Sequence, residues 1–347
     1  GLIGENDAVI LIRDSSNHGE IMSAIIIDGN DDFYSYDLGG IIGENDGRIT
    51  LNNVYNNATV SGVYDVGGII GDNDFTYIDN STFSSFINVK NYGSVIAENP
   101  SDNEDYLGFE NLNDIYSNNK NNFRVGGLIG DNKANLIISQ SANHARVSAL
   151  NNDVDITSVY VGGLIGNHNA EDGAEIRIYQ SYNMGNVSSN ENSVGGLIGN
   201  VQYEIEVFNV NSSVVHLISD SYNIGTVSGD TNLGGLVGSI TGSYLTIENS
   251  YASSLVSGAN VTGALIGEIR TGGITFSGVF YPDTQLISIG AIIGSPTISG
   301  NPTAASDVNM VLPNTFIDSG WNITDTSVDT TTWSIGFNGD YSYPYLT

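Results

Sequence analysis

Cysteine is absent from this 347-residue chain, which excludes disulfides and thiolate metal sites from its fold. Basic residues are also scarce, because 9 lysines and arginines face 39 acidic residues and leave a formal net charge of −30. Such a surface repels nucleic acids and anionic lipids at long range and attracts cations. No apolar run approaches the roughly 20 residues of a membrane span. We therefore expect no nucleic-acid partner and no direct membrane insertion.

Residues that would support catalysis are few and dispersed. The four histidines occur singly, and the sequence contains neither a His-Glu-x-x-His nor a Gly-x-Ser-x-Gly motif. Arginines and lysines are scattered along the chain and do not converge. Paired carboxylates, which a glycoside hydrolase needs, are uninformative in a chain with 39 acidic residues. The sequence predicts no catalytic residue, no organic cofactor and no enzymatic activity.

Glycine is abundant, and much of it belongs to one recurring motif. The stretch Val-Gly-Gly-Leu-Ile-Gly, with close variants, recurs at residues 38–43, 66–71, 125–130, 161–166, 194–199 and 233–238. Looser copies occupy residues 263–267 and 290–294, and a copy expected near residues 93–97 lacks its Gly-Gly pair. A unit repeated about every 30 residues indicates a stacked array, in which no unit buries its apolar face alone.

Each repeat contains three short segments separated by Gly, Asn, Asp and Ser. The first alternates apolar and polar residues (176–178), the second reads Tyr-Asn-x-Gly-x-Val (182–187), and the third contains the paired glycines. Short alternating runs between turn residues are typical of half-buried strands. We predict an all-β chain that folds as a right-handed parallel β-helix of about ten three-strand rungs over residues 1–300. Residues from about 98 to 122 are predicted to form an insertion.

Two columns of identical side chains follow from this stacking. Side-chain amides on successive rungs can hydrogen-bond along the stack, and the predicted ladder comprises Asn56, Asn91, Asn143, Asn183 and Asn223. A predicted aromatic column comprises Tyr55, Tyr182, Tyr222 and Tyr251. Both columns are expected to face the core. Paired glycines normally weaken a strand, so we also expect either a corner there or stacked backbones too close for a Cβ.

The repeat stops at residue 300, and residues 301–347 form a different segment. This segment contains both tryptophans of the chain, Trp321 and Trp333. An open β-helix end exposes core and a strand edge, which must be covered. We expect the segment to cap the last rung. Alternatively, it docks on the first rung of a neighbouring copy, and such a head-to-tail contact would propagate a fibre.

Acidic turns are the best candidates for a metal site. Their hard oxygen ligands suit Ca²⁺, although none has the spacing of an EF-hand. The predicted ligands are Asp28, Asp31 and Asp32, and the turns at residues 44–46 and 72–74 are similar. The alternative is that turns simply favour Asp, Asn and Gly. Glycosylation sequons occur at Asn57, Asn80, Asn186, Asn211, Asn260 and Asn322.

The Gly-Gly motif, preceded by Ser-Tyr-Asn-x-Gly-x-Val, resembles the GLUG repeat of bacterial and archaeal surface proteins. The ending, with Gly-Trp at 320–321, Trp-Ser-Ile at 333–335 and Tyr-Pro-Tyr-Leu at 343–346, resembles the segment that closes such arrays. The resemblance implies a secreted β-solenoid used as a stalk or adhesive surface. We expect an extracellular or cell-surface adhesin or filament subunit, whose partners are surface glycans, proteins or copies of itself. The alternative is a carbohydrate-binding or carbohydrate-active β-helix protein.

Overall fold

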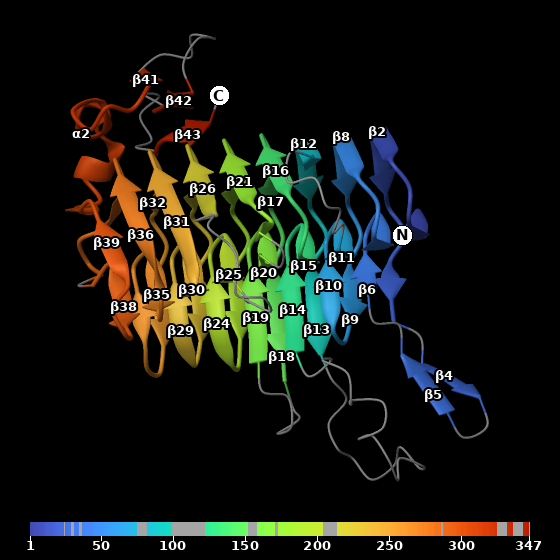
Figure 1. Cartoon of the computed structure of the whole chain (residues 1–347). Coiled ribbons are helices and arrows are strands. Elements are labelled where there is room, and N and C mark those ends of the chain that lie inside the picture. The colour runs from blue at the N-terminus through green and yellow to red at the C-terminus, as the bar shows by residue number, and fades with distance from the viewer. Residues whose placement is uncertain are drawn as a thin grey trace.

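The chain is a parallel β-helix, as the repeats predict. The computed structural model describes residues 1–23, 25–28, 31–34, 37–74, 82–98, 122–151, 158–170, 173–203, 214–285, 287–324, 332–335 and 343–346. Within these residues the chain winds repeatedly through four parallel sheets, numbered here in the order in which each coil passes them. Figure 1 shows the strands stacked side by side from the N-terminal end to the last coil.

Sheets 1 and 2 carry the first half of each coil. Sheet 1 contains β2 (Ile10–Asn17), β8 (Ile49–Asn56), β12 (Ser84–Asn91), β16 (Leu136–Ser139), β17 (Ala142–Asn143), β21 (Ile176–Tyr179), β22 (Tyr182–Asn183), β26 (Val215–Ser219), β27 (Tyr222–Asn223), β31 (Ser243–Glu248), β32 (Tyr251–Ala252), β36 (Gly272–Ser277), β37 (Phe280–Pro282), β39 (Thr297–Ser299) and β40 (Thr303–Ala305). Sheet 2 contains β3 (Ile21–Met22), β9 (Val60–Gly62), β13 (Val95–Glu98), β18 (Val147–Leu150), β23 (Val187–Ser189), β28 (Val227–Gly229) and β33 (Val256–Gly258).

Sheets 3 and 4 carry the Gly-Gly motif. Sheet 3 contains β6 (Asp37–Gly39), β10 (Asp65–Gly67), β14 (Asn122–Gly126), β19 (Ser158–Gly162), β24 (Asn192–Gly195), β29 (Thr231–Gly234) and β34 (Thr262–Gly263). Sheet 4 contains β1 (Ile3–Asn6), β7 (Ile42–Asn45), β11 (Ile70–Asn73), β15 (Ile129–Asn132), β20 (Ile165–Asn169), β25 (Ile198–Gln202), β30 (Val237–Thr241), β35 (Ile266–Ile269) and β38 (Ile289–Ile292).

The repeats stay in register along the whole stack, including the predicted insertion. Residues 99–121 lie outside the described part of the chain, yet β10 pairs directly with β14, and β11 with β15. The insertion therefore lies within a single coil, and it does not replace a rung of the stack. The Gly-Gly copy expected near residues 93–97 is the one at residues 125–130, further along the same coil. The nine strands of sheet 4 accordingly mark nine coils in the described residues, close to the predicted number of about ten.

The paired glycines lie where the chain bends from sheet 3 into sheet 4. A Cβ on Gly163 would lie only 2.0 Å from the carbonyl oxygen of Gly196 and 2.4 Å from Cγ of Asn183. Both expected reasons for glycine therefore apply, because the chain turns here and stacked backbones also approach too closely for a side chain. The bend divides the predicted third strand into two. Each complete coil consequently passes through four sheets, and the prediction of three strands per rung was too low.

A second bend lies within sheet 1. In seven coils, one residue there has a left-handed backbone conformation, with φ between 42° and 58°, and these residues are Asp14, Asn53, Asn88, Gln140, Gln180, Asp220 and Asn249. Asn and Asp adopt this conformation more readily than most residues, which explains their frequency in the column. The bend separates the alternating first segment from the Tyr-Asn segment that follows it.

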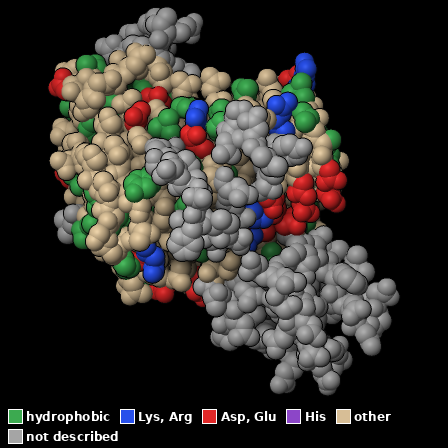
Figure 2. Space-filling view, viewed as in Figure 1, with side chains coloured by type: hydrophobic (Ala, Val, Ile, Leu, Met, Phe, Trp, Pro, Cys, Tyr) green, Lys and Arg blue, Asp and Glu red, His purple; other side chains and the backbone are tan. Residues whose placement is uncertain are grey.

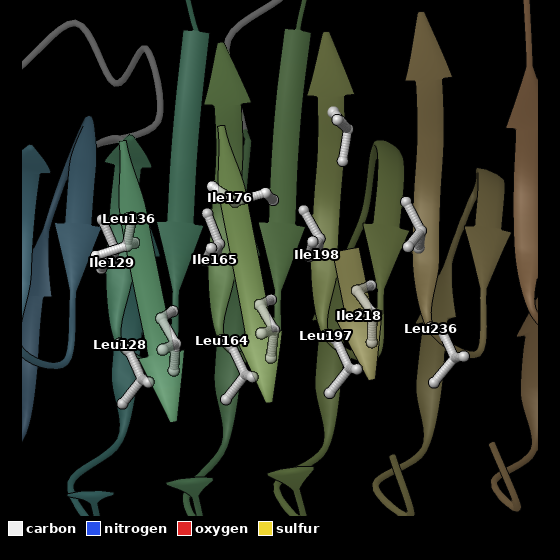
Figure 3. Close-up of a cluster of buried hydrophobic side chains, with 14 of the residues drawn as sticks. Leu128, Ile129, Leu136, Leu164, Ile165, Ile176, Leu197, Ile198, Ile218 and Leu236 are labelled. Carbon is white, nitrogen blue, oxygen red and sulfur yellow. The ribbon is translucent and has the colours of Figure 1, made fainter. Parts of the chain in front are cut away.

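The core is continuous along the axis and has two parts. Leu and Ile side chains of sheets 1 and 4 form one part, and mainly valines of sheets 2 and 3 form the other. Figure 3 shows how identical positions stack, with Leu128, Leu164, Leu197 and Leu236 in one row. Because each coil buries its apolar residues against the next, the core grows with coil number and needs no globular centre.

Segments outside the four sheets lie at the two ends of the chain. Strands β4 (Ile25–Asp28) and β5 (Asp31–Tyr34) form an antiparallel hairpin that projects from the N-terminal end in Figure 1. The parallel stack continues to Ala305, slightly beyond the predicted limit of 300. The C-terminal segment then contains η2 (Asn309–Val311), α2 (Pro313–Ile317), β41 (Ile323–Thr324), β42 (Trp333–Ser334) and β43 (Tyr345–Leu346). No helix among the described residues is long and apolar enough to cross a membrane.

Candidate functional site

The structure places all five predicted ladder asparagines in one buried column of sheet 1. Each Nδ2 donates a hydrogen bond to Oδ1 of the asparagine on the next coil, at 2.8–2.9 Å. Asn17 precedes this column, and Ser254 accepts the last of its hydrogen bonds. Each ladder asparagine also hydrogen-bonds the backbone two residues further on, as Asn183 does with Gly185. The ladder therefore closes turns inside the fold and presents no free group to a ligand.

A second asparagine ladder, missed in the sequence, runs through sheet 4. Asn6, Asn45, Asn73 and Asn132 are linked Nδ2 to Oδ1 at 2.6–2.7 Å. The signal was present, because each of these residues ends an Ile-Gly-Glu-Asn or Ile-Gly-Asp-Asn sequence in the Gly-Gly motif. The next coil substitutes His168, whose Nδ1 lies 2.9 Å from Nδ2 of Asn132.

Two histidines meet in the core, next to the second ladder. The rings of His168 and His216 are fully buried, with centroids 4.9 Å apart in an edge-to-face arrangement. Neither Nε2 atom has a hydrogen-bond partner. Burial lowers the pKa of His168 to about 4 and that of His216 well below its usual value. The pair is therefore neutral at physiological pH. The other two histidines, His18 and His144, lie elsewhere on sheet 1 or beside it.

The predicted aromatic column points away from the core, contrary to expectation. Tyr182, Tyr222 and Tyr251 stack face to face at 4.9 and 5.1 Å on the outer side of sheet 1. The reason is the alternation of a strand: each tyrosine directly precedes a position whose side chain faces inward, so its own side chain must face outward. Tyr55 occupies the same register but is separated from Tyr182 by Lys90 and Ala142.

The C-terminal segment covers this outward column instead of the end of the last coil. Trp333 packs on Tyr222 and Tyr251 at centroid distances of 5.8 and 6.0 Å, and its Nε1 donates to Asp220 at 3.1 Å. The Tyr251 hydroxyl donates to the carbonyl oxygen of Pro344 at 2.6 Å. The expected cap over the last rung is therefore a cover on its side. Apolar residues around the last coil remain exposed, namely Ile287, Ile292, Ile293 and Ile298.

A short aromatic strip continues the tyrosine column on the open surface. Tyr92 is 46% exposed and stacks on His144, with centroids 4.7 Å apart and planes at 19°. His144 in turn meets the edge of Tyr182 at 5.5 Å. These three rings, called the aromatic strip below, lie on successive coils beside the part covered by the C-terminal segment.

Carboxylates gather near the N-terminal end of the stack, where Figure 2 shows a group of acidic side chains. Asp37 and Asp65 are neighbours in sheet 3, and Asp72 follows the Gly-Gly bend into sheet 4. One carboxylate oxygen from each lies within 4.8 Å of the other two. Arg124 Nη1 lies 3.0 Å from Asp65 Oδ2, and Lys133 Nζ lies 3.3 Å from Asp72 Oδ2. We call this group the acidic cluster.

The predicted calcium ligands lie apart from this cluster. Asp28 pairs with Asp31 in the hairpin of β4 and β5, and Asp32 pairs with Ile27, while their side chains lie outside the described part of the structure. Another acidic trio, Glu5, Asp7 and Asp46, is exposed to solvent.

Four of the six predicted sequons lie in the described part of the structure. The described asparagines are all exposed at the surface, and these are Asn57, Asn186, Asn260 and Asn322. Asn80 and Asn211 lie outside the described residues, as do most of the expansions predicted between the repeats. These four exposed sequons are accessible to a glycosylating enzyme.

Comparison with known proteins adds little to these observations. No family model matches the chain, and no curated protein matches it. Among solved structures, it is similar to one described as a "putative immunoglobulin A1 protease" from Bacteroides ovatus. That similarity has 15% sequence identity and a TM-score of 0.44, and it covers 97% of this chain and 75% of the other. At this level it carries no functional argument.

Proposed function

We propose that the chain is an extracellular structural and adhesive β-solenoid of the GLUG-repeat type, which serves as a cell-surface adhesin module or filament subunit. The observation that supports this best is the continuity of the array. Nine coils stack in register, and their inward polar side chains are occupied by ladders that hold one coil to the next. Such a structure is suited to spanning distance and presenting a long lateral surface.

The surface chemistry agrees with this role. The net charge of −30 keeps the chain soluble and discourages contact with nucleic acids or anionic membranes. Apolar side chains are exposed at both ends of the described stack, where another β-rich surface could pack against them. Attachment to glycans, to other proteins or to copies of the chain would then use the lateral face or these ends.

Immunogold labelling of intact source cells, with antibodies raised against the purified chain, tests the proposal. We expect label on the cell envelope or on extracellular filaments. Beads coated with the folded chain should also bind to the same cells, whereas beads coated with the heat-unfolded chain should not. Label confined to the cytoplasm would refute the extracellular role, and equal binding by both sets of beads would refute specific adhesion.

The aromatic strip favours a second candidate function, binding of carbohydrate. Exposed aromatic rings with one apolar face and a polar edge are suited to amphipathic ligands, and sugar rings have such faces. Tyr92 is the most accessible member of the strip. If this function is correct, Tyr92→Ala should weaken binding on a glycan array at least about tenfold, whereas Tyr244→Ala, which changes an exposed tyrosine elsewhere on sheet 1, should not.

A further inference from the structure

The acidic cluster has a geometry that neither adhesion nor the ladders explain. Asp37, Asp65 and Asp72 come from three strands, and the Gly-Gly bend brings the last two together across sheets 3 and 4. Their carboxylate oxygens meet within 4.8 Å, close to the separation of oxygens that share one cation at 2.3–2.6 Å. Asp37 is only partly buried, so the cluster is open to solvent on one side.

Two oxygen atoms in this cluster lack any hydrogen-bond partner. Asp65 and Asp72 are each only 7% exposed, and the Oδ1 atom of each is buried and unpartnered. The Oδ2 atoms, by contrast, accept hydrogen bonds from Arg124 and Lys133. Leaving a buried carboxylate oxygen unpartnered is costly, which indicates that a further positively charged group belongs beside these Oδ1 atoms.

The charges around the cluster also favour a further cation beside these oxygen atoms. Within the described residues, the carboxylates of Asp65, Asp72, Asp74 and Asp131 share two cationic side chains, Arg124 and Lys133. Asp131 is fully partnered, since Asn167 donates to its Oδ1 and Arg124 to its Oδ2. Asp65 and Asp72 therefore share their cations with other carboxylates, and each keeps one buried oxygen without a hydrogen-bond partner.

We propose that Asp37, Asp65 and Asp72 bind one Ca²⁺ ion. All the ligands are hard carboxylate oxygens, and neither histidine nor cysteine lies in the cluster, which disfavours zinc and copper. Ca²⁺ accepts irregular oxygen sets completed by water, whereas Mg²⁺ requires a near-ideal octahedron. The ion would tie the second and third coils together at the bend. This site is separate from the predicted ligands in the β4–β5 hairpin, and it does not depend on the proposed function.

Calcium titration of the intact chain tests the proposal. After treatment with EDTA and dialysis at pH 8, we expect saturable binding of CaCl₂ by isothermal titration calorimetry. CaCl₂ should also raise the melting temperature by about 2 °C or more above its value in MgCl₂ at matched ionic strength. Asp65→Asn and Asp72→Asn should each weaken the measured affinity at least about tenfold. Asp7→Asn, in the exposed acidic trio, should retain the wild-type response.

Two results would overturn the assignment. One is the absence of calcium binding by the wild-type chain, together with a higher melting temperature for Asp65→Asn, which would show that protons alone neutralise the cluster. The other is a calcium response that persists unchanged in Asp65→Asn and Asp72→Asn, which would place the ion elsewhere. If either variant fails to fold, Asp37→Asn provides the same comparison at a partly exposed ligand.

Discussion

Asparagine contributes more to this fold at the residue scale than its polarity suggests. Asn183 uses both amide hydrogens and both lone pairs of its oxygen, on Asn143, Asn223 and the backbone of Gly185. Its amide also lies over Gly163 of the preceding coil, in space that a Cβ there would occupy. The ladder and the second glycine of each pair are thus two parts of one packing arrangement.

Replacing one ladder asparagine should destabilise the stack without disturbing the surface. We expect Asn183→Leu to lower the free energy of unfolding by about 1–3 kcal/mol, because its partners on both sides lose buried hydrogen bonds. Urea denaturation followed by circular dichroism measures this change. Asn52→Leu is the control, since Asn52 is exposed on β8 of the same sheet. Equal effects of the two substitutions would show that the ladder contributes nothing specific.

The buried histidines predict a pH dependence of stability. An unfolded histidine binds a proton below about pH 6.5, whereas folded His168 stays neutral down to about pH 4. The contribution of His168 to the free energy of unfolding is therefore complete above about pH 6.5. It should decrease by about 3 kcal/mol as the pH is lowered to 4. The neighbouring His216 acts in the same direction, while the charge of Asp131 opposes it.

Matched variants separate this effect from the titration of the many carboxylates. His168→Asn would continue the second ladder from Asn132 with a group that does not titrate. We expect its free energy of unfolding, measured by urea denaturation between pH 4 and pH 7, to depend less on pH than that of the wild type. His18→Asn, at an exposed position, should keep the wild-type dependence. An unchanged dependence in His168→Asn would contradict the assignment.

At the scale of elements, the C-terminal segment stabilises the last coils through aromatic contacts. Trp321 and Trp333 pack on each other at 4.7 Å and lie beside Tyr251, and Phe280 and Phe316 extend the cluster. The Trp321 Nε1 donates to the carbonyl oxygen of Gly278 at 2.8 Å. The segment therefore acts as a lateral clamp across three coils, which differs from a plug at the end of the stack.

Truncation of the central tryptophan should release this clamp. Trp333 is fully buried, so we expect Trp333→Ala to destabilise the segment by about 3–5 kcal/mol. Limited proteolysis should then remove residues beyond 305 much faster, with the rest of the β-helix intact. Tyr345→Ala, at a position that is 40% exposed, should change the cleavage rate little. Resistance of Trp333→Ala to cleavage would mean that the segment is held by other contacts.

At the scale of the whole molecule, apolar side chains are exposed at both ends of the described stack. Apolar side chains exposed near the first coil are Leu2, Val9, Leu11 and Met22, while isoleucines are exposed around the last coil. Sheets 1 and 4 both reach each end, as β2 and β1 on one side and β39 and β38 on the other. A head-to-tail contact would continue both sheets, and because it does not close, it would form a fibre.

Assembly of this kind should depend on the last coil. We expect the sedimentation coefficient of the intact chain to rise with concentration, and Ile292→Lys combined with Ile298→Lys to abolish the rise by burying charge in the contact. Leu255→Lys is the matched control, because Leu255 is 61% exposed on the side of a coil. An intact chain that remains monomeric at every concentration would rule out self-assembly through the ends.

Periodicity alone determined the architecture of this protein. Identical residues at a fixed spacing can satisfy their hydrogen bonds and bury their apolar faces only by stacking, so the β-helix and the first asparagine ladder followed from the repeat. Even the outward direction of the tyrosines was available, because a residue next to an inward asparagine in a strand must face the other side. The second ladder was equally visible in the residues that follow each Gly-Gly motif.

Only the tertiary structure decided what the departures from the repeat do. The acidic cluster joins Asp37, Asp65 and Asp72 across two coils and a bend, and no spacing rule marks three acids among 39 as neighbours. The C-terminal segment does not repeat, so no equivalent position predicts its place. It packs on the tyrosine column because aromatic side chains are present on that surface. Sequence periodicity specifies contacts between equivalent positions, whereas contacts between non-equivalent positions depend on how the bends orient the sheets.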